Sequence, residues 1–162
     1  GRIGQATAKM ALGLGMKVIA ADMFIPTVDV KVEFFDGQSI TTTIVSQSLE
    51  SLFKEADFIT LHVPAQDGYI VDEAALAIMK DGVGIVNCAR GGVVDEIALI
   101  KALDSGKVSF AGLDVFESEP KPEITILMHP KISLTPHIGA ATGEAQDRIG
   151  TELASQIISL LG

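Results

Sequence analysis

The sequence contains few of the residues that form disulfides, ligate metals such as zinc or bind polyanions. Cys88 is the only cysteine, so the chain cannot form an internal disulfide, and a single thiol is typical of a reducing compartment such as the cytoplasm. One cysteine and three scattered histidines provide no cluster with metal-ligand spacing, so we expect no metal site. Lysine and arginine number 12 against 21 aspartates and glutamates. The net charge of −9 disfavours nucleic acid and anionic membranes as partners, because both are bound through clustered basic residues.

Long apolar runs are also missing. None approaches the roughly 20 residues that cross a bilayer, and no basic segment is followed by an apolar one, as in a leader. What is present is the composition of a globular protein: 162 residues, 48% hydrophobic and 20% charged. This length fits one domain with a buried core, and the composition argues against disorder. We therefore expect a cytoplasmic protein without a membrane partner.

Helical and strand patterns alternate along the chain. Apolar residues that recur every three or four positions predict helices, and short apolar runs that end at glycine, proline or an acid predict strands. The predicted helices cover residues 4–15, 48–56, 72–80, 94–106 and 142–162, and the predicted strands cover 17–22, 57–64, 83–89, 109–115 and 132–136. The strands lack polar alternation, as expected when helices cover both faces of a parallel sheet. The pattern predicts a doubly wound α/β fold.

Residues 28–45 interrupt this alternation. Apolar residues occupy every second position from Val28 to Phe34, then Asp36 and Gly37 follow, and a β-branched stretch comes next. This pattern predicts a β-hairpin inserted beside the second strand, with a structural role.

The chain begins with the second half of a glycine motif, G-x-G-x-x-G. In a dinucleotide-binding unit, Gly1 and Gly4 would let the backbone approach the pyrophosphate at a helix N-terminus. Asp22 ends the next predicted strand, where an acid would bind the ribose hydroxyls of NAD and repel the 2′-phosphate of NADP. The first glycine and the central strand that leads into it are missing. We therefore expect a segment of a longer polypeptide, unless another chain supplies the strand.

Three polar side chains follow three later strands. Arg90 is followed by Gly91 and Gly92, which would allow a ligand to approach, and Glu119 and His137 follow the next two strands. Hydride transfer to a carbonyl needs a cation for the substrate carboxylate, an acid for the forming alkoxide and a partner for that acid. The residues alone leave other interpretations open: an exposed ion pair for Arg90, a satisfied loop histidine, and Glu117 in place of Glu119.

Three further residues need an interpretation. Asp114 lies in an apolar strand, where it should accept hydrogen bonds from a ligand or from backbone donors. His62 ends a strand and is interpreted as structural. Cys88 would suit a Cys–His hydrolase only on a raised nucleophile turn, and at the end of a buried strand we expect it to pack.

Five stretches, in order, resemble the signatures of the D-isomer-specific 2-hydroxyacid dehydrogenase family. They are residues 1–22, "LHVP", "VNCARGGVVDEIAL", "AGLDVFESEP" and "LTPHIGAATGEAQ". The resemblance extends over essentially the whole chain except the hairpin. The resemblance implies a Rossmann-like NAD-binding domain over residues 1–162, lacking its first strand, with NAD as cofactor. Within the family the stretches are most similar to the D-3-phosphoglycerate dehydrogenases. That similarity implies oxidation of 3-phosphoglycerate to 3-phosphooxypyruvate, in serine biosynthesis.

The resemblance also implies roles for individual residues. His137 would be the general acid/base, Glu119 its partner and Arg90 the cation that binds the substrate carboxylate. Cofactor contacts are implied for Gly1, Arg2, Ile3, Gly4, Asp22, Val63, Pro64, Cys88, Ala89, Arg90, Asp114, His137, Gly139 and Ala140. Among these, Asp114 would lie at the carboxamide side of the nicotinamide.

Family members carry an N-terminal substrate-binding domain, which is absent here, so the resemblance leaves the small-molecule 2-hydroxyacid open. Glyoxylate/hydroxypyruvate reductase and D-lactate dehydrogenase are alternatives. An NAD-sensing binding protein, such as a transcriptional corepressor, is an alternative of another class. The resemblance further implies a homo-oligomer.

Overall fold

The computed structural model describes residues 1–161; Gly162, the last residue of the predicted C-terminal helix, lies outside them. The helices α1 to α6 cover Arg2–Gly13, Leu49–Glu55, Glu73–Ile78, Glu96–Ser105, Ile124–Leu127 and Gly143–Leu161. The strands β1 to β6 cover Thr27–Glu33, Ser39–Val45, Phe58–Leu61, Val83–Asn87, Val108–Leu113 and Ile132–Leu134. Every predicted helix and strand is present except the strand at residues 17–22, and the short helix α5 was not predicted.

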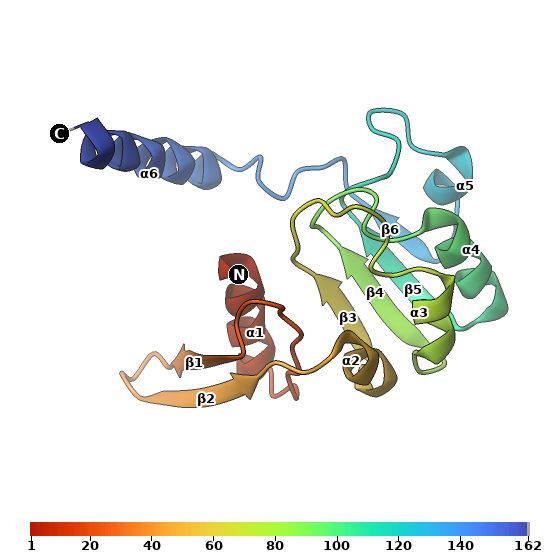
Figure 1. Cartoon of the computed structure of the whole chain (residues 1–162), viewed down its shortest axis with the longest axis horizontal. Helices are drawn as coiled ribbons and strands as arrows, with labels where there is room; N and C mark the ends of the chain where they lie inside the picture. Colours follow the sequence, from red (N-terminus) through yellow and green to blue (C-terminus); the bar gives the residue numbers. More distant parts are fainter. Residues whose placement is uncertain (162) are drawn as a thin grey trace.

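Strands β3 to β6 form a parallel sheet in that order, at the right of Figure 1. Each crossover between neighbouring strands contains a helix, α3, α4 or α5. Leu61, Asn87 and Leu113 lie in one row across the sheet, at the carboxyl ends of β3, β4 and β5. The α/β class with a parallel sheet is therefore confirmed, and the loops after these strands emerge along one edge.

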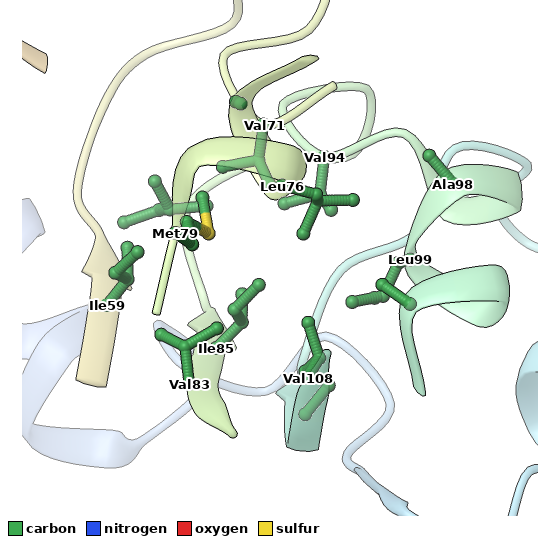
Figure 2. Packing of buried hydrophobic residues seen from close by; sticks show 14 of the residues in the cluster. Ile59, Val71, Leu76, Met79, Val83, Ile85, Val94, Ala98, Leu99 and Val108 are labelled. Carbon is green, nitrogen blue, oxygen red and sulfur yellow. The ribbon is translucent and has the colours of Figure 1, made fainter. Parts of the chain in front are cut away.

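Helices α2, α3 and α4 cover one face of this sheet and enclose the core. Ile59, Ile85 and Val108 of the strands meet Leu76 of α3 and Leu99 of α4 (Figure 2). Ile85, Leu99 and Val108 are completely buried, and each such side chain stabilises the fold by roughly 1.5–3 kcal/mol relative to an exposed one. The core thus fixes the strands whose ends carry the candidate site.

The ends of these helices follow from local sequence. Ser48, Asp72 and Asp95 each accept a hydrogen bond from the backbone N–H three residues later, which satisfies a free donor of the first turn. Gly106 caps the C-terminus of helix α4, and its φ of 81° lies in the left-handed region.

The opposite face of the sheet is exposed in residues 1–161. Phe58 of β3 and Phe110 of β5 flank Gly84 of β4, with ring centroids 6.1 Å apart, and remain 59% and 41% exposed. Helices were expected on this face too, because parallel sheets are usually covered on both. Helix α1 packs against β1 instead, and it contains no buried residue.

Helix α6 projects away from the sheet (Figure 1). Its apolar residues Ile149, Leu153 and Ile157 follow the predicted spacing and are 53%, 55% and 47% exposed. An ion pair between Arg2 Nη1 and Glu152 Oε1, at 2.5 Å, links it to α1. No helix within residues 1–161 is both long enough and apolar enough to cross a membrane.

The predicted hairpin is confirmed. Strands β1 and β2 pair antiparallel from Thr27↔Val45 to Glu33↔Ser39, and Gly37 provides the positive φ that the turn requires. The side chains of Val30 in β1 and Ile44 in β2 are buried.

Residues 17–22 do not form the predicted strand. They make one isolated parallel bridge, Ala20↔Ser46, and Gln47 N–H donates to the oxygen of Ala20 at 2.9 Å. An inner strand needs a partner on each side. Within residues 1–161, this segment pairs on one side only, with Ser46 next to β2. No strand in this part of the chain pairs with the outer edge of β3. The segment therefore stays too weakly paired to be a strand.

Candidate active site

The predicted catalytic residues emerge from the same edge of the sheet. Arg90 lies three residues after β4, Glu119 follows β5, and His137 follows β6. In sheets of this kind, ligands bind outside the carboxyl ends of the strands. The structure brings Glu119 and His137 into direct contact, whereas the guanidinium of Arg90 has a different partner.

Glu119 and His137 form a carboxylate–imidazole pair. Oε2 of Glu119 lies 2.7 Å from Nδ1 of His137, and Oε1 accepts a hydrogen bond from the backbone N–H of Phe116 at 3.0 Å. These two hydrogen bonds hold the pKa of Glu119 below its ordinary value, and the one with His137 has the larger effect. An ionised carboxylate only accepts, so Nδ1 carries the shared proton and Nε2 remains free for a ligand. The His137 side chain is 47% exposed and can be reached.

A cavity of about 430 Å³ opens beside this pair. Its remaining walls are mostly apolar and are formed by Phe116, Pro120, Pro122, Leu127, Leu134, Thr135 and Pro136. Small-molecule sites commonly have this form, an apolar hollow with a few convergent polar groups.

Glu117, the other carboxylate of this loop, is tied to α4. Its Oε1 accepts a hydrogen bond from the backbone N–H of Glu96 at 2.9 Å, and its Oε2 accepts one from the hydroxyl of Tyr69 at 3.2 Å. Glu96 returns the contact by accepting from the N–H of Glu117 at 2.8 Å. Glu119, rather than Glu117, is therefore the carboxylate beside the imidazole.

Asp114 holds the loop that carries His137. Directly after β5 and only 3% exposed, it accepts hydrogen bonds from Thr135 Oγ1 at 2.6 Å and from the N–H groups of Ile138 and Gly139, both at 2.9 Å. Burial acts to raise the pKa of Asp114, but these hydrogen bonds outweigh it and the pKa is lowered. The predicted need for donors is confirmed. Thr135 was not a candidate; its sequence signal is a hydroxyl directly after an apolar strand.

Arg90 is exposed and folds back on its own loop. Its Nη1 donates to the backbone oxygen of Ala89 at 2.6 Å. Buried Asn87 shapes the loop, because its Nδ2 donates to the oxygen of Arg90 and its Oδ1 accepts from the N–H of Ala89, both at 3.0 Å. The guanidinium is thus held at the sheet edge by one hydrogen bond, from Nη1 to the main chain.

The glycine next to Arg90 is required by the fold. A Cβ on Gly91 would collide with the backbone oxygen of Phe116. At Gly91 another backbone segment therefore occupies the space that a side chain would take, whereas Gly92 has open space around it, and ligand approach at these glycines stays a prediction. This contact sets the spacing between the Arg90 loop and the loop of Glu119.

Cys88 is exposed, so the prediction that it packs inside is wrong; β4 ends one residue earlier, at Asn87. Partial burial and the neighbouring Asp114 carboxylate raise the pKa of the Cys88 thiol. The thiol is therefore protonated at neutral pH, which speaks against a cysteine nucleophile.

The N-terminal candidates lie around the start of α1. Gly1 is the N-cap, with no side-chain cap and no acid in the first turn, so backbone N–H groups remain for an anion. Oδ2 of Asp22 lies 3.4 Å from the nitrogen of Gly1, and Oδ1 accepts from the N–H groups of Phe24 and Ile25. The two backbone hydrogen bonds lower the pKa of Asp22, so it is negative at neutral pH.

The other predicted cofactor-binding residues lie in different surroundings. Arg2 pairs with Glu152 of α6, and Ile3 is 68% exposed. A Cβ on Gly4 would lie 3.7 Å from the Cβ of His62. The pKa of His62 is lowered, mainly because the ring is partly buried. After β3 and β6, the main-chain candidates Val63, Pro64, Gly139 and Ala140 lie at the sheet edge.

These residues fit a dinucleotide. The uncapped N-terminus of α1 suits a pyrophosphate, and the negative Asp22 beside it suits ribose hydroxyls. One family description, "D-isomer specific 2-hydroxyacid dehydrogenase, NAD binding domain", matches residues 1–139. The chain belongs to this family. The resemblance seen in the sequence is confirmed, the fold is the Rossmann-like NAD-binding domain of these dehydrogenases, and the cofactor is NAD.

Individual relatives carry several substrate names. Hydroxypyruvate reductase from Thermotoga maritima is 48% identical over 167 residues, 100% of this chain and 51% of that protein. D-3-phosphoglycerate dehydrogenase from Methanocaldococcus jannaschii is 43% identical over 99% of this chain and 30% of its own. The structure of D-lactate dehydrogenase from Aquifex aeolicus, complexed with NAD and lactic acid, matches with a TM-score of 0.75 and 34% identity, over 99% of this chain and 51% of that one. The chain spans about half of these relatives, or less.

Proposed function

We propose that the protein transfers hydride between a D-2-hydroxyacid and NAD. The observation that carries this proposal is the 2.7 Å contact between Oε2 of Glu119 and Nδ1 of His137, beside a cavity of about 430 Å³. Membership of the dehydrogenase family supports the same chemistry.

Each residue has a distinct task in this reaction. In oxidation, Nε2 of His137 takes the proton of the substrate hydroxyl, since Nδ1 is engaged by Glu119. The ionised Glu119 then stabilises the positive ring. Arg90 exchanges its contact with Ala89 for the substrate carboxylate, which its planar fork matches in two hydrogen bonds. Bound NAD supplies the acceptor for the hydride.

We infer 3-phosphoglycerate as the substrate and serine biosynthesis as the pathway. The support is the similarity of the sequence stretches and the 43% identity to a D-3-phosphoglycerate dehydrogenase. Hydroxypyruvate is a second candidate, favoured by the 48% identity to a hydroxypyruvate reductase. Values of kcat/KM for the full-length gene product with 3-phosphoglycerate, D-glycerate and D-lactate separate them. A highest value for D-glycerate would favour the second candidate.

The variant His137→Gln tests the reaction itself. Loss of the proton-transfer group should lower kcat by about 10²–10⁴-fold in the full-length gene product, with little change in NAD affinity. His129→Gln is the matched control, because His129 contacts Asp104 of α4, away from the pair. Unchanged turnover in His137→Gln would refute the assignment.

We also propose that a strand ahead of Gly1 completes the sheet and that a separate substrate domain accompanies it. Within residues 1–161, the outer edge of β3 and the segment at Ala20 each lack a second strand partner. One buried unpaired backbone group costs about 1–3 kcal/mol, so an added strand would stabilise both segments. Calorimetry should find that the full-length gene product binds NAD more tightly than residues 1–162 alone; equal affinities would contradict the proposal.

A homo-oligomer and a cytoplasmic location remain proposals. The first rests on the family resemblance, and the second on the single cysteine of the chain. Sedimentation of the full-length gene product tests the assembly, and cell fractionation tests the location.

A further inference from the structure

We propose that Glu96 and Glu117 are positioning residues that set the place of the Glu119 carboxylate. They do so by holding the loop after β5 against the N-terminus of α4. This inference rests on the proposed function of the Glu119–His137 pair. Neither positioning residue lines the cavity beside that pair, so we expect both to act through the main chain of the loop and not on the substrate.

Glu96 and Glu117 make a reciprocal contact between α4 and the loop. The backbone N–H of Glu96 donates to Oε1 of Glu117 at 2.9 Å, and the N–H of Glu117 donates to Oε1 of Glu96 at 2.8 Å. The second oxygen of Glu117 accepts from the hydroxyl of Tyr69 at 3.2 Å, which fixes the orientation of this carboxylate. Because a movement of either main-chain segment would break both backbone contacts, the pair sets the spacing between the helix and the loop.

This contact lies at the start of the segment that ends in Glu119. The N–H of Phe116, the residue before Glu117, donates to Oε1 of Glu119 at 3.0 Å. The other oxygen of Glu119 lies 2.7 Å from Nδ1 of His137. Residues 117–121 are exposed, so burial does not hold this part of the loop. The place of the carboxylate beside the imidazole therefore depends on where the main chain of Phe116 and Glu117 is fixed.

Glu96 is only 7% exposed, although it is the first residue of α4. The pKa of Glu96 is raised, mostly by burial and in part by the negative charges of Glu117 and Glu123, while the hydrogen bond from the N–H of Glu117 acts in the opposite direction. The contact does not require the charge, because the carbonyl oxygen of a protonated carboxyl group also accepts an N–H. A neutral side chain with an oxygen in the same place should therefore replace Glu96.

Stabilisation of α4 is the simpler explanation of this contact, since a carboxylate that accepts a first-turn N–H stabilises a helix. Asp95 already caps this helix by accepting from the N–H of Ala98 at 2.9 Å. The two explanations predict different results at His137. Capping alone changes the free energy of unfolding, whereas positioning also changes the protonation of the ring that Glu119 contacts.

The tautomer of His137 distinguishes the two explanations. In protein labelled with ¹⁵N-histidine and studied at alkaline pH, the ring ¹⁵N shifts show which nitrogen of the neutral imidazole carries the proton, and their loss in His137→Gln assigns them. Contact with Glu119 keeps this proton on Nδ1, whereas a free imidazole carries it mainly on Nε2. Glu96→Ala in the full-length gene product should increase the Nε2–H form of His137, and kcat should fall by roughly tenfold.

Three further variants complete the test. Glu96→Gln keeps an oxygen for the N–H of Glu117, so the tautomer and kcat should return close to the wild-type values. Glu73→Ala is the matched control, because Glu73 is exposed and also directly follows an aspartate cap, Asp72 of α3, and it should change neither quantity. Glu117→Ala removes the other half of the contact at an exposed residue, and it replaces Glu96→Ala if that protein does not fold.

The tautomer decides the proposal, and kcat decides whether the pair works in turnover. A wild-type tautomer in folded Glu96→Ala, or in Glu117→Ala where only that protein folds, would overturn positioning and leave a capping role. Glu96→Gln as impaired as Glu96→Ala would overturn it too, since the hydrogen bond would not be its basis. An altered tautomer with unchanged kcat would support positioning and refute the proposed role of His137 in proton transfer. If the wild-type protein turned over no 2-hydroxyacid, the proposed function would fail, yet the tautomer would still decide this proposal.

Discussion

The backbone oxygen of Phe116 packs so closely against Gly91 that no side chain fits at Gly91. The N–H of Phe116 also donates to Oε1 of Glu119 at 3.0 Å. Phe116 therefore joins two loops, the one that carries Arg90 and the one that carries Glu119. The spacing between the cation and the carboxylate–imidazole pair depends on a glycine with no functional group.

Gly91→Ala should therefore be strongly destabilising. The new methyl group meets main chain, which cannot move aside as a side chain can, so we expect a loss of at least about 1–3 kcal/mol in the free energy of unfolding. Denaturant unfolding measures this loss. Gly150→Ala is the control: Gly150 lies within α6 with open space around it, and alanine there should be neutral or slightly stabilising. Equal stabilities of the two variants would contradict the role of Gly91.

Glu119→Gln should change both the turnover and the way the free energy of unfolding depends on pH in acid. Because the pKa of Glu119 is lowered from 4.5 in the folded protein, its ionised form stabilises the fold above that value, and this contribution disappears as the pH falls through the lowered pKa. The variant should thus be less stable than wild type at neutral pH and equally stable in acid. Turnover should fall about tenfold or more, since a neutral amide stabilises the positive imidazole poorly.

Unfolding at neutral and acidic pH, together with steady-state kinetics, checks the Glu119 prediction. Exposed Asp67, in the loop after β3, provides the control Asp67→Asn. A stability difference between wild type and Glu119→Gln that persisted unchanged in acid would show that the hydrogen bonds, and not the charge, matter.

Asp22→Asn should relax the choice between NAD and NADP. Asp22 is negative at neutral pH because backbone hydrogen bonds lower its pKa, and a negative group repels the 2′-phosphate of NADP. Removing the charge should raise the affinity for NADP relative to NAD by roughly tenfold. Fluorescence titration of the full-length gene product measures both affinities. Asp36→Asn, at the hairpin turn, should leave the ratio unchanged; an unchanged ratio in Asp22→Asn would remove Asp22 from the cofactor site.

Gly84→Ala tests the exposed face of the sheet. A Cβ there would lie 2.5 Å from Cζ of Phe110 and 2.9 Å from Cδ1 of Phe58, both ring atoms on an open surface. Because the rings can move, we expect a loss of only about 1 kcal/mol. Phe110→Ala in the same protein should relieve the contact, which gives a coupling energy of about 0.5–1 kcal/mol in a double-mutant cycle. Strictly additive effects would mean that the two positions do not meet.

Local sequence determined most elements of this protein and where the helices begin. Capping side chains act within one helical turn, so Ser48 and Asp95 mark helix starts without knowledge of the rest of the fold. The hairpin turn likewise follows from Asp36 and Gly37 alone. The spacing of the family stretches singled out Glu119 and His137, and the fold brings these two residues into contact.

The tertiary structure alone decided what depends on distant neighbours. Residues 17–22 have strand character, but a strand also needs partners, and those lie elsewhere in the chain. The space at Gly91 is taken by Phe116, 25 positions away (116 − 91), and the donors to Asp114 come from beyond β6. Periodicity and short motifs report on the chain within a few residues, whereas these contacts arise when separate loops meet at one edge of the sheet.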